Sequence, residues 1–238
     1  MNTFRSTCLA AALVVPTFAY AETELSANVA LTTDYVWRGV SQTYEDPAIQ
    51  GGFDFEHDSG FAAGVWASNV DFADTDKGDT EDGADMEFDV YASYGGEFGE
   101  DWNYGVGIIY YMYPGTVSGA DYDWLEVSGS LGWGPVAFAI NYSSDVFNSN
   151  ETGIYYNLSG SHEIEGFTLS AGIGFYDFDD AVFGPGVPDS YTDWHLGVST
   201  SFVGVDWDLS YYDTNGDGED LFGDWADSRA VLTVSKSF

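Results

Sequence analysis

Basic side chains are scarce in this chain of 238 residues, which has 5 lysines and arginines against 40 aspartates and glutamates, for a formal net charge of -35. A nucleic-acid partner is therefore excluded, because the charge contacts with phosphates would be repulsive. Acidic chains can be disordered, but disordered chains are poor in aromatic residues. Here 18% of the residues are Phe, Trp or Tyr, so a folded protein is expected.

Cysteine is almost absent, and the single Cys8 lies in a segment with the features of a secretory signal peptide. Residues 1–21 combine a short n-region, an apolar stretch at 8–15 and the sequence AYA at 19–21, which fits a cleavage site. We expect a mature chain of residues 22–238 without disulfides. Long apolar runs are also missing, since no other run approaches the ~18 residues of a membrane-spanning helix. A mature protein that lies in a membrane must therefore cross it with strands.

Apolar and polar residues alternate through most of the mature chain. The last stretch, residues 229–238, alternates up to the aromatic residue Phe238 on its apolar face. A terminal aromatic in this position suits an outer-membrane barrel that closes on its first strand, and we predict that Phe238 is the signal for membrane insertion. The first stretch, residues 25–38, is long enough to cross a bilayer at a tilt. It places Tyr35 and Trp37 on the apolar face, where an aromatic girdle would lie.

The alternating unit occurs twelve times, and the connections between units are alternately short and long. The expected strands are 25–38, 49–56, 61–70, 86–94, 102–112, 125–131, 136–142, 154–161, 167–176, 194–198, 205–212 and 229–238. This pattern predicts an all-β fold, a single-chain transmembrane antiparallel up-and-down barrel, with short turns in the periplasm and long loops outside. A soluble β-sandwich is the alternative, but it gives no reason for the alternation in loop length.

Parity assigns most of the strand charges to the lumen, because a charge on the lipid face costs about 2 to 4 kcal/mol near the midplane. Arg38 and Arg229 are expected near the extracellular ends of adjacent strands, paired with carboxylates. Inward aromatic residues such as Tyr111 and Trp124 could fill the lumen, whereas inward Gly107 and its small neighbours leave space. The lumen-facing candidates are Asp34, Arg38, Asp54, Glu56, Glu87, Asp89, Glu126, Asp206, Asp208 and Arg229, with Asp193 on the same face.

Two acidic segments are candidates for divalent cations. Residues 213–218, DTNGDG, match the opening of a calcium loop. Asp224 stands at the twelfth position, where an EF-hand usually has a glutamate, so the segment is not an EF-hand. The hypothesis is a weak Ca²⁺ site outside the cell. The acidic loop 71–85 is the second candidate, and a solvated acidic loop is the alternative reading of both. The proposed calcium ligands are Asp213, Asn215, Asp217 and Asp224.

Three segments carry a family resemblance. Residues 27–43 (ANVALTTDYVWRGVSQT), 191–199 (YTDWHLGVS) and 234–238 (VSKSF) resemble the TorF family of porins, formerly a conserved hypothetical outer-membrane family. The likeness covers the whole mature chain, and the segment DYVWRGVSQ is its most specific part. The resemblance implies an outer-membrane barrel and carries over no binding residues.

These features favour a passive channel for small solutes that prefers cations. The alternative is a non-conducting barrel whose acidic, calcium-binding outer loops have a structural or interaction role. An enzyme is not predicted, because His57, His162 and His195 lie in no nucleophile motif. The expected location is the outer membrane of a Gram-negative bacterium, and the expected partners are the lipid bilayer, the outer-membrane assembly machinery and small solutes.

Overall fold

The computed structural model describes residues 23–72, 83–116, 121–179 and 182–238. The predicted signal peptide, residues 1–21, and most of the acidic loop 71–85 lie outside these ranges. The remaining predictions fall on described residues.

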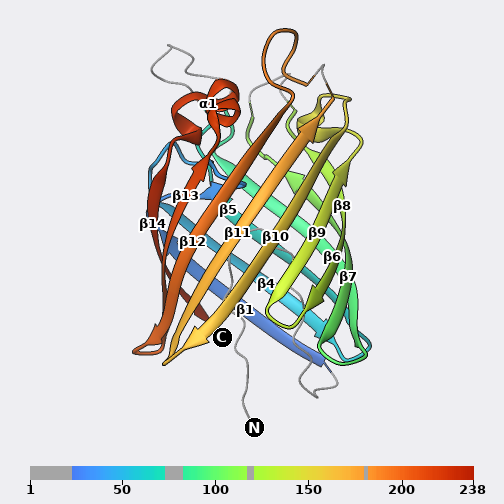
Figure 1. The fold of residues 1–238 in the computed structure, drawn as a ribbon, viewed down its shortest axis with the longest axis vertical. Helices are drawn as coiled ribbons and strands as arrows, with labels where there is room; N and C mark the ends of the chain where they lie inside the picture. The colour runs from blue at the N-terminus through green and yellow to red at the C-terminus, as the bar shows by residue number, and fades with distance from the viewer. Residues whose placement is uncertain (1–22, 73–82, 117–120, 180–181) are drawn as a thin grey trace.

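Twelve antiparallel strands form one closed barrel, in the spatial order β1-β14-β13-β12-β11-β10-β9-β8-β7-β6-β5-β4 (Figure 1). Each strand pairs with its neighbour in the chain, and β14 closes the wall by pairing with β1. The predicted twelve-stranded up-and-down barrel is therefore confirmed. The strands are β1 Thr23–Thr32, β4 Ala48–His57, β5 Phe61–Asn69, β6 Met86–Phe98, β7 Trp102–Met112, β8 Trp124–Trp133, β9 Val136–Ser143, β10 Gly153–Ile164, β11 Phe167–Phe178, β12 Ser190–Phe202, β13 Val205–Thr214 and β14 Arg229–Ser237.

The two ends of the barrel differ in the length of their connections. β1 begins and β14 ends at the barrel end with the short turns, for example Val203-Gly204 between β12 and β13 (Figure 1). The other end carries the long connections, including the helix α1 Gly216–Phe222 and the short 3-10 helices η2 Val146–Asn148 and η3 Gly223–Ala226. By the rule for bacterial barrels, the long-loop end is extracellular and the short-turn end periplasmic. Within the described ranges, no helix is long and apolar enough to cross a membrane.

The outer surface of the wall is apolar. Leu25, Phe53 and Val106 are more than half exposed, as expected of side chains that face lipid acyl chains. Exposed aromatic residues gather near both strand ends, as in the girdles that sit at the headgroups of a bilayer. At the short-turn end they include Phe98, Trp102, Trp133, Phe167 and Phe202, and at the long-loop end Tyr110, Tyr142, Phe175 and Tyr211. A closed wall satisfies its backbone hydrogen bonds internally, which a β-structure needs in order to cross a membrane.

The first predicted strand, 25–38, is wrong at its C-terminal end. β1 ends at Thr32, and the chain then leaves the wall for fifteen residues before β4 begins at Ala48. Tyr35 and Trp37 are only 2% and 9% exposed, so neither belongs to an outer girdle. The segment 33–47 instead contains a separate two-stranded hairpin of β2, Val36–Trp37, and β3, Val40–Ser41. Alternation continued through 33–38, but those residues turn inward.

The interior is asymmetric along the barrel axis. Its long-loop half is filled by buried aromatic side chains, among them Trp37, Tyr111, Trp124, Tyr176 and Tyr191. The short-turn half is lined by small inward residues that are partly exposed although they face the inside of a closed wall. These include Ser93, Gly107, Ser128, Ala139, Ser159 and Gly172. The packed core of this barrel therefore lies at the extracellular end of the lumen.

Candidate functional site in the barrel lumen

The hairpin of β2 and β3 is built around a tight turn at Arg38 and Gly39. Both residues have positive φ, 49° and 81°, and Trp37 pairs with Val40 across the turn. A Cβ atom at Gly39 would lie 2.7 Å from Cβ of Asp193 and 2.8 Å from Cγ2 of Thr214. Glycine is therefore required twice, for the backbone conformation and for the close approach of the hairpin tip to the wall.

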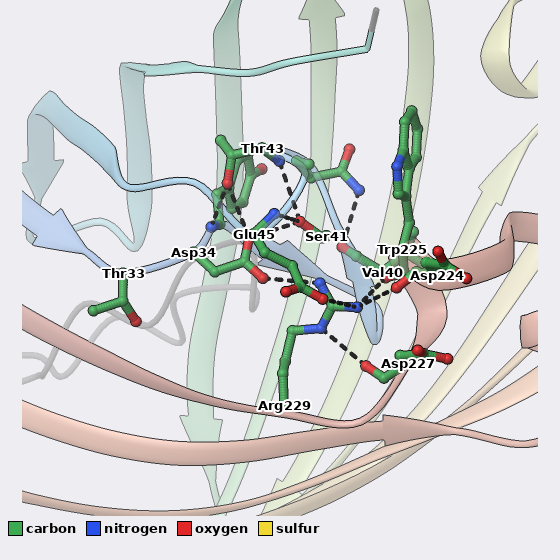
Figure 2. Close-up of polar contacts among 12 residues, drawn as sticks. Thr33, Asp34, Val40, Ser41, Thr43, Glu45, Asp224, Trp225, Asp227 and Arg229 are labelled. Atoms are coloured by element: carbon green, nitrogen blue, oxygen red, sulfur yellow. Dashed lines mark hydrogen bonds and ion pairs between the residues drawn. The ribbon is translucent and has the colours of Figure 1, made fainter. Parts of the chain in front are cut away.

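A buried ion pair fixes the base of the hairpin to the closing strand. Arg229 Nη1 on β14 donates to Asp34 Oδ2 at 2.9 Å, and Asp34 Oδ1 accepts from the hydroxyls of Ser41 at 2.7 Å and Thr43 at 2.9 Å (Figure 2). Both charged side chains are buried. Asp34 therefore holds together the two ends of the hairpin segment and the wall.

The same guanidinium also organises the loop before β14. Arg229 Nη2 donates to the carbonyl oxygens of Asp224 and Trp225 at 2.8 Å each, and Nε donates to the carbonyl oxygen of Asp227 at 2.9 Å (Figure 2). Glu45 adds a longer contact of 3.8 Å from an exposed position. Because Arg229 links hairpin, loop and wall, movement of one of them disturbs the other two.

Arg38 at the hairpin tip crosses the lumen to the opposite wall. Its Nη2 donates to both carboxylate oxygens of Glu126 on β8, at 2.8 Å each. The guanidinium carbon lies 4.2 Å from the ring centres of Trp37 and Tyr155 and 4.7 Å from that of Tyr176. These are cation–π distances, so the positive charge is satisfied by one carboxylate and three rings.

Glu87 and Asp89 form a second charged group, on β6. Both are buried, at 2% and 5% exposure, and no cationic side chain of the described residues makes an ion pair with either. The Tyr35 hydroxyl donates to Glu87 Oε1 at 3.0 Å, whereas Asp89 Oδ1 has no hydrogen-bond partner. Burial raises the pKa of the Tyr35 hydroxyl well above its ordinary value, and the neighbouring Glu87 adds to the effect, so Tyr35 keeps its proton.

A cavity of about 340 Å³ lies between the hairpin and the extracellular loops. The hairpin segment contributes Trp37, Val40 and Gln42, the strands contribute Glu87 and buried aromatic rings, and the loops complete the lining. Glu87 is the only acidic or basic side chain among the described residues that line it. The lining is Trp37, Val40, Gln42, Phe72, Glu87, Tyr111, Tyr113, Tyr122, Trp124, Phe147, Phe183, Tyr191, Phe222 and Trp225, which we call the aromatic cavity.

A family model described as "Bacterial protein of unknown function (Gcw_chp)" matches residues 18–238. The chain belongs to the Gcw_chp family. Among solved structures, the NanC porin superposes with a TM-score of 0.54 at 11% identity, covering 89% of this chain and 98% of that one. The KdgM porin gives a TM-score of 0.53 at 9% identity, covering 90% and 99%. No curated protein shows a significant match in sequence.

The comparisons and the lipid-facing surface together identify the fold as an outer-membrane β-barrel of the size of small porins. At identities near 10%, the likeness shows the shared fold and leaves the lumen chemistry to this chain's own residues. This Gcw_chp family member therefore lies in the outer membrane, embedded in the lipid bilayer by its outer surface. Predicted location and observed architecture agree.

The remaining predicted lumen carboxylates lie towards the periplasmic end of the Gcw_chp barrel. Asp54 accepts hydrogen bonds from the Tyr91 hydroxyl and from Asn28 Nδ2. Glu56 is near the end of β4, and Asp206 accepts from Ser201. Asp208 accepts from the Ser210 hydroxyl at 2.6 Å. These four groups are partly exposed, unlike the buried set around the hairpin, and the two sets do not come together.

The segment proposed to bind calcium is partly helical in the structure. Asp213 and Thr214 end β13, and α1 begins at Gly216 after Asn215, the N-cap whose side chain accepts from the Gly218 backbone N–H. Asn215 Nδ2 also donates to Asp217 Oδ2, and Asp224 lies in the first turn of η3. Asparagine is a favoured N-cap residue, and capping uses the oxygen that a metal would need. No group of three or more metal-ligating side chains occurs among the described residues.

Phe238, His57 and His162 lie at or near the short-turn end of the barrel. The Phe238 backbone exchanges hydrogen bonds with Ala27 of β1, at 2.9 and 3.3 Å, and its side chain is 71% exposed at the short-turn end. His57 contacts Ser59 within the turn after β4, and His162 is exposed near the end of β10. His195 faces the lumen beside the Tyr212 ring.

Sequence reasoning missed that the segment DYVWRGVSQT is a lumen element rather than a strand end. Tyr35, Trp37, Ser41 and Thr43 were not among the candidates, and all four are buried around the hairpin. One signal was present in the sequence. Gly39 follows a bulky aromatic and an arginine, and two hydroxyl residues come soon after, which is turn chemistry rather than strand chemistry.

Proposed function

We propose that this protein is a narrow outer-membrane channel for passive diffusion of small solutes, with a preference for cations. The observation that carries the proposal is the exposure of small inward residues such as Gly107 and Ser128 inside a closed wall. Space that reaches these residues from the periplasmic end is accessible to water. Twelve strands also enclose more space than eight, whose interiors their own side chains nearly fill.

The cation preference rests on the charge balance of the lumen. Arg38 and Arg229 are each neutralised by a buried carboxylate, Glu126 and Asp34. Other carboxylates have no cationic partner among the described residues. Glu87 and Asp89 lie towards the extracellular end of the lumen, and the group around Asp208 lies towards the periplasmic end. A low-dielectric wall focuses their field on the pore, which attracts cations and repels anions.

The inserted hairpin sets the constriction of the proposed channel. Trp37 makes edge-on contacts with Tyr111, Trp124 and Tyr176, with ring centres about 6.1 Å apart in each case. Tyr111 and Trp124 stack on each other with centres 4.5 Å apart. Solutes therefore pass at this level only beside the hairpin or after it moves, and we expect a small unit conductance.

The second candidate function is a non-conducting barrel whose loops serve a structural or interaction role. The packing around Trp37 favours it, because a hairpin that never moved would close the extracellular half. The two candidates differ in one measurable property, the passage of ions.

The two ends of the sequence and the TorF-like segments concern location and assembly. The TorF-like segments support assignment to that porin group within the outer membrane. Residues 1–21 direct export, and Phe238 presents the closing strand to the assembly machinery. We expect no enzymatic activity, because His57 and Ser59 meet within an exposed turn and the ring contact of His195 is with Tyr212.

Current through planar bilayers containing purified, folded protein tests the proposal. We expect small unit steps and a reversal potential in a KCl gradient that indicates cation preference. The Debye length is about 10 Å at 0.1 M salt, so the preference should weaken towards 1 M. Heat-unfolded protein serves as the control. Folded protein that leaves the bilayer sealed supports the non-conducting barrel, and an anion preference contradicts the electrostatic argument.

A further inference from the structure

The aromatic cavity has the size and enclosure of a ligand site. Its volume of about 340 Å³ falls at the lower end of the ~300–1,000 Å³ typical of small-molecule pockets. Its lining residues Trp124 and Tyr191 are at most 2% exposed, while Phe222 and Trp225 are only partly buried. The cavity therefore has a buried side on the hairpin and strands and a more exposed side at the extracellular loops.

The chemistry of the lining is unusual for a pore. Eleven of its fourteen residues are aromatic, and the others are Val40, Gln42 and Glu87. Aromatic faces carry partial negative charge and attract cations, and a carboxylate adds a full negative charge. Arg38 shows that this lumen already stabilises a cation in this way, since its guanidinium lies over three rings and pairs with Glu126.

The charge at Glu87 lacks a counterion among the described residues. Arg38 and Arg229 are engaged by Glu126 and Asp34, and the Tyr35 hydroxyl that donates to Glu87 carries no charge. Tyr113 and Asp89 also hydrogen-bond to Glu87 and bring no positive charge. Next to it, Asp89 is 5% exposed and its Oδ1 has no partner. A buried carboxylate is ionised at least cost when a positive charge lies beside it, so a cation in the cavity would stabilise the charge of Glu87.

We infer that the aromatic cavity binds a small organic cation, such as a quaternary ammonium group. Glu87 faces the positive charge, and the rings surround its alkyl groups. A strongly hydrated ion such as Na⁺ or K⁺ would lose water to an apolar lining that offers few oxygen ligands, whereas an alkylated ammonium loses little. The inference goes beyond the proposed channel and does not depend on whether the barrel conducts, because a binding site can serve selective passage or capture.

Calorimetric titration of detergent-folded protein with choline tests the inference, with 3,3-dimethyl-1-butanol as the neutral probe of the same shape. We expect saturable binding of choline and at least about tenfold weaker binding of the alcohol, since only the cation gains from the rings and the carboxylate. Binding of choline should persist in excess K⁺.

Two variants locate the site, and a third is the matched control. Glu87→Gln should weaken choline binding about tenfold, and Phe222→Leu, at the partly exposed side of the cavity, by a few fold. Glu56→Gln removes the same type of charge at the other end of the lumen and should leave binding unchanged. Heat-modifiable migration on gels shows that each variant is folded.

The inference is overturned if folded protein fails to bind choline, if the neutral alcohol binds equally well, or if Glu87→Gln and Glu56→Gln have the same effect. A current measurement separates this result from the proposed function. Choline binding without conduction supports the cation site and contradicts the channel. Conduction without choline binding supports the channel and contradicts the cation site.

Discussion

Asp34 and Arg229 are 195 residues apart in the chain, and their side chains form a buried ion pair with Nη1 and Oδ2 2.9 Å apart. The pair connects the first long connection of the barrel to its last strand. It therefore holds the hairpin in the lumen at the seam where the wall closes.

Replacement of Asp34 by Asn should loosen the hairpin. Breaking one partner of a buried pair leaves a buried charge without compensation, so we expect the free energy of unfolding to fall by about 3–5 kcal/mol. Unfolding in urea, followed by tryptophan fluorescence, measures the loss. Glu45→Gln is the matched control, because Glu45 contacts the same arginine from an exposed position and should change stability by less than about 1 kcal/mol. Equal effects of the two changes would contradict the role given to Asp34.

Gly39→Ala should displace the hairpin tip. The new Cβ would meet Asp193 and Thr214 at less than 3 Å, in addition to the strain of a φ of 81°. Gly204→Ala is the control, since its φ is 78° and nothing lies within 4 Å of the added Cβ. Gly204→Ala should cost about 1 kcal/mol for backbone strain alone, and Gly39→Ala distinctly more.

The current through a planar bilayer provides a second measurement on the two variants Gly39→Ala and Gly204→Ala. If the hairpin forms the constriction, Gly39→Ala raises the unit conductance or makes it noisy, whereas Gly204→Ala leaves it unchanged. Indistinguishable currents from both variants and the unmodified protein would place the constriction elsewhere.

Neutralising Glu87 and Asp89 together should reduce the cation preference without unfolding the barrel. Substitutions in the lumen of a β-barrel tune selectivity rather than membrane insertion. Reversal potentials at low ionic strength measure the effect, which should shrink at high salt as screening increases. Asp58→Asn, in an exposed periplasmic turn, serves as the control and should leave the reversal potential unchanged. A double variant that keeps the original preference would assign selectivity to other groups.

Phe238→Asp should abolish accumulation of folded protein in the outer membrane, because we expect the assembly machinery to read the terminal aromatic of the closing strand. Phe202→Asp is the comparison, since Phe202 is 66% exposed at the same end of the barrel. Charged substitutions near the interface cost only about 0–1 kcal/mol, so Phe202→Asp should still assemble. Heat-modifiable protein in outer-membrane fractions gives the measurement, and normal levels of Phe238→Asp would refute the signal.

The sequence by itself determined the wall of this barrel. Strands have a side-chain period of two, and lipid accepts almost no charge, so alternation from Leu25 to Phe238 fixed twelve strands and their outward faces. The alternation of short and long connections fixed which end faces the periplasm. Inward placement of Glu87, Asp89 and Glu126 follows from the same two constraints.

Only the tertiary structure decided what fills the lumen. The alternation of apolar and polar residues is the same whether residues 33–38 continue the wall or turn into the barrel. Tyr35 and Trp37 could therefore not be placed from the pattern. The choice depends on contacts between distant parts of the chain, such as Asp34 with Arg229 and Arg38 with Glu126. The DTNGDG segment was undecided for a similar reason, because its oxygens can cap a helix or bind a metal. The Asn215 cap favours the helix locally, and the contacts of Arg229 with the carbonyl oxygens of Asp224 and Trp225, further along the same loop, exist only in the assembled barrel.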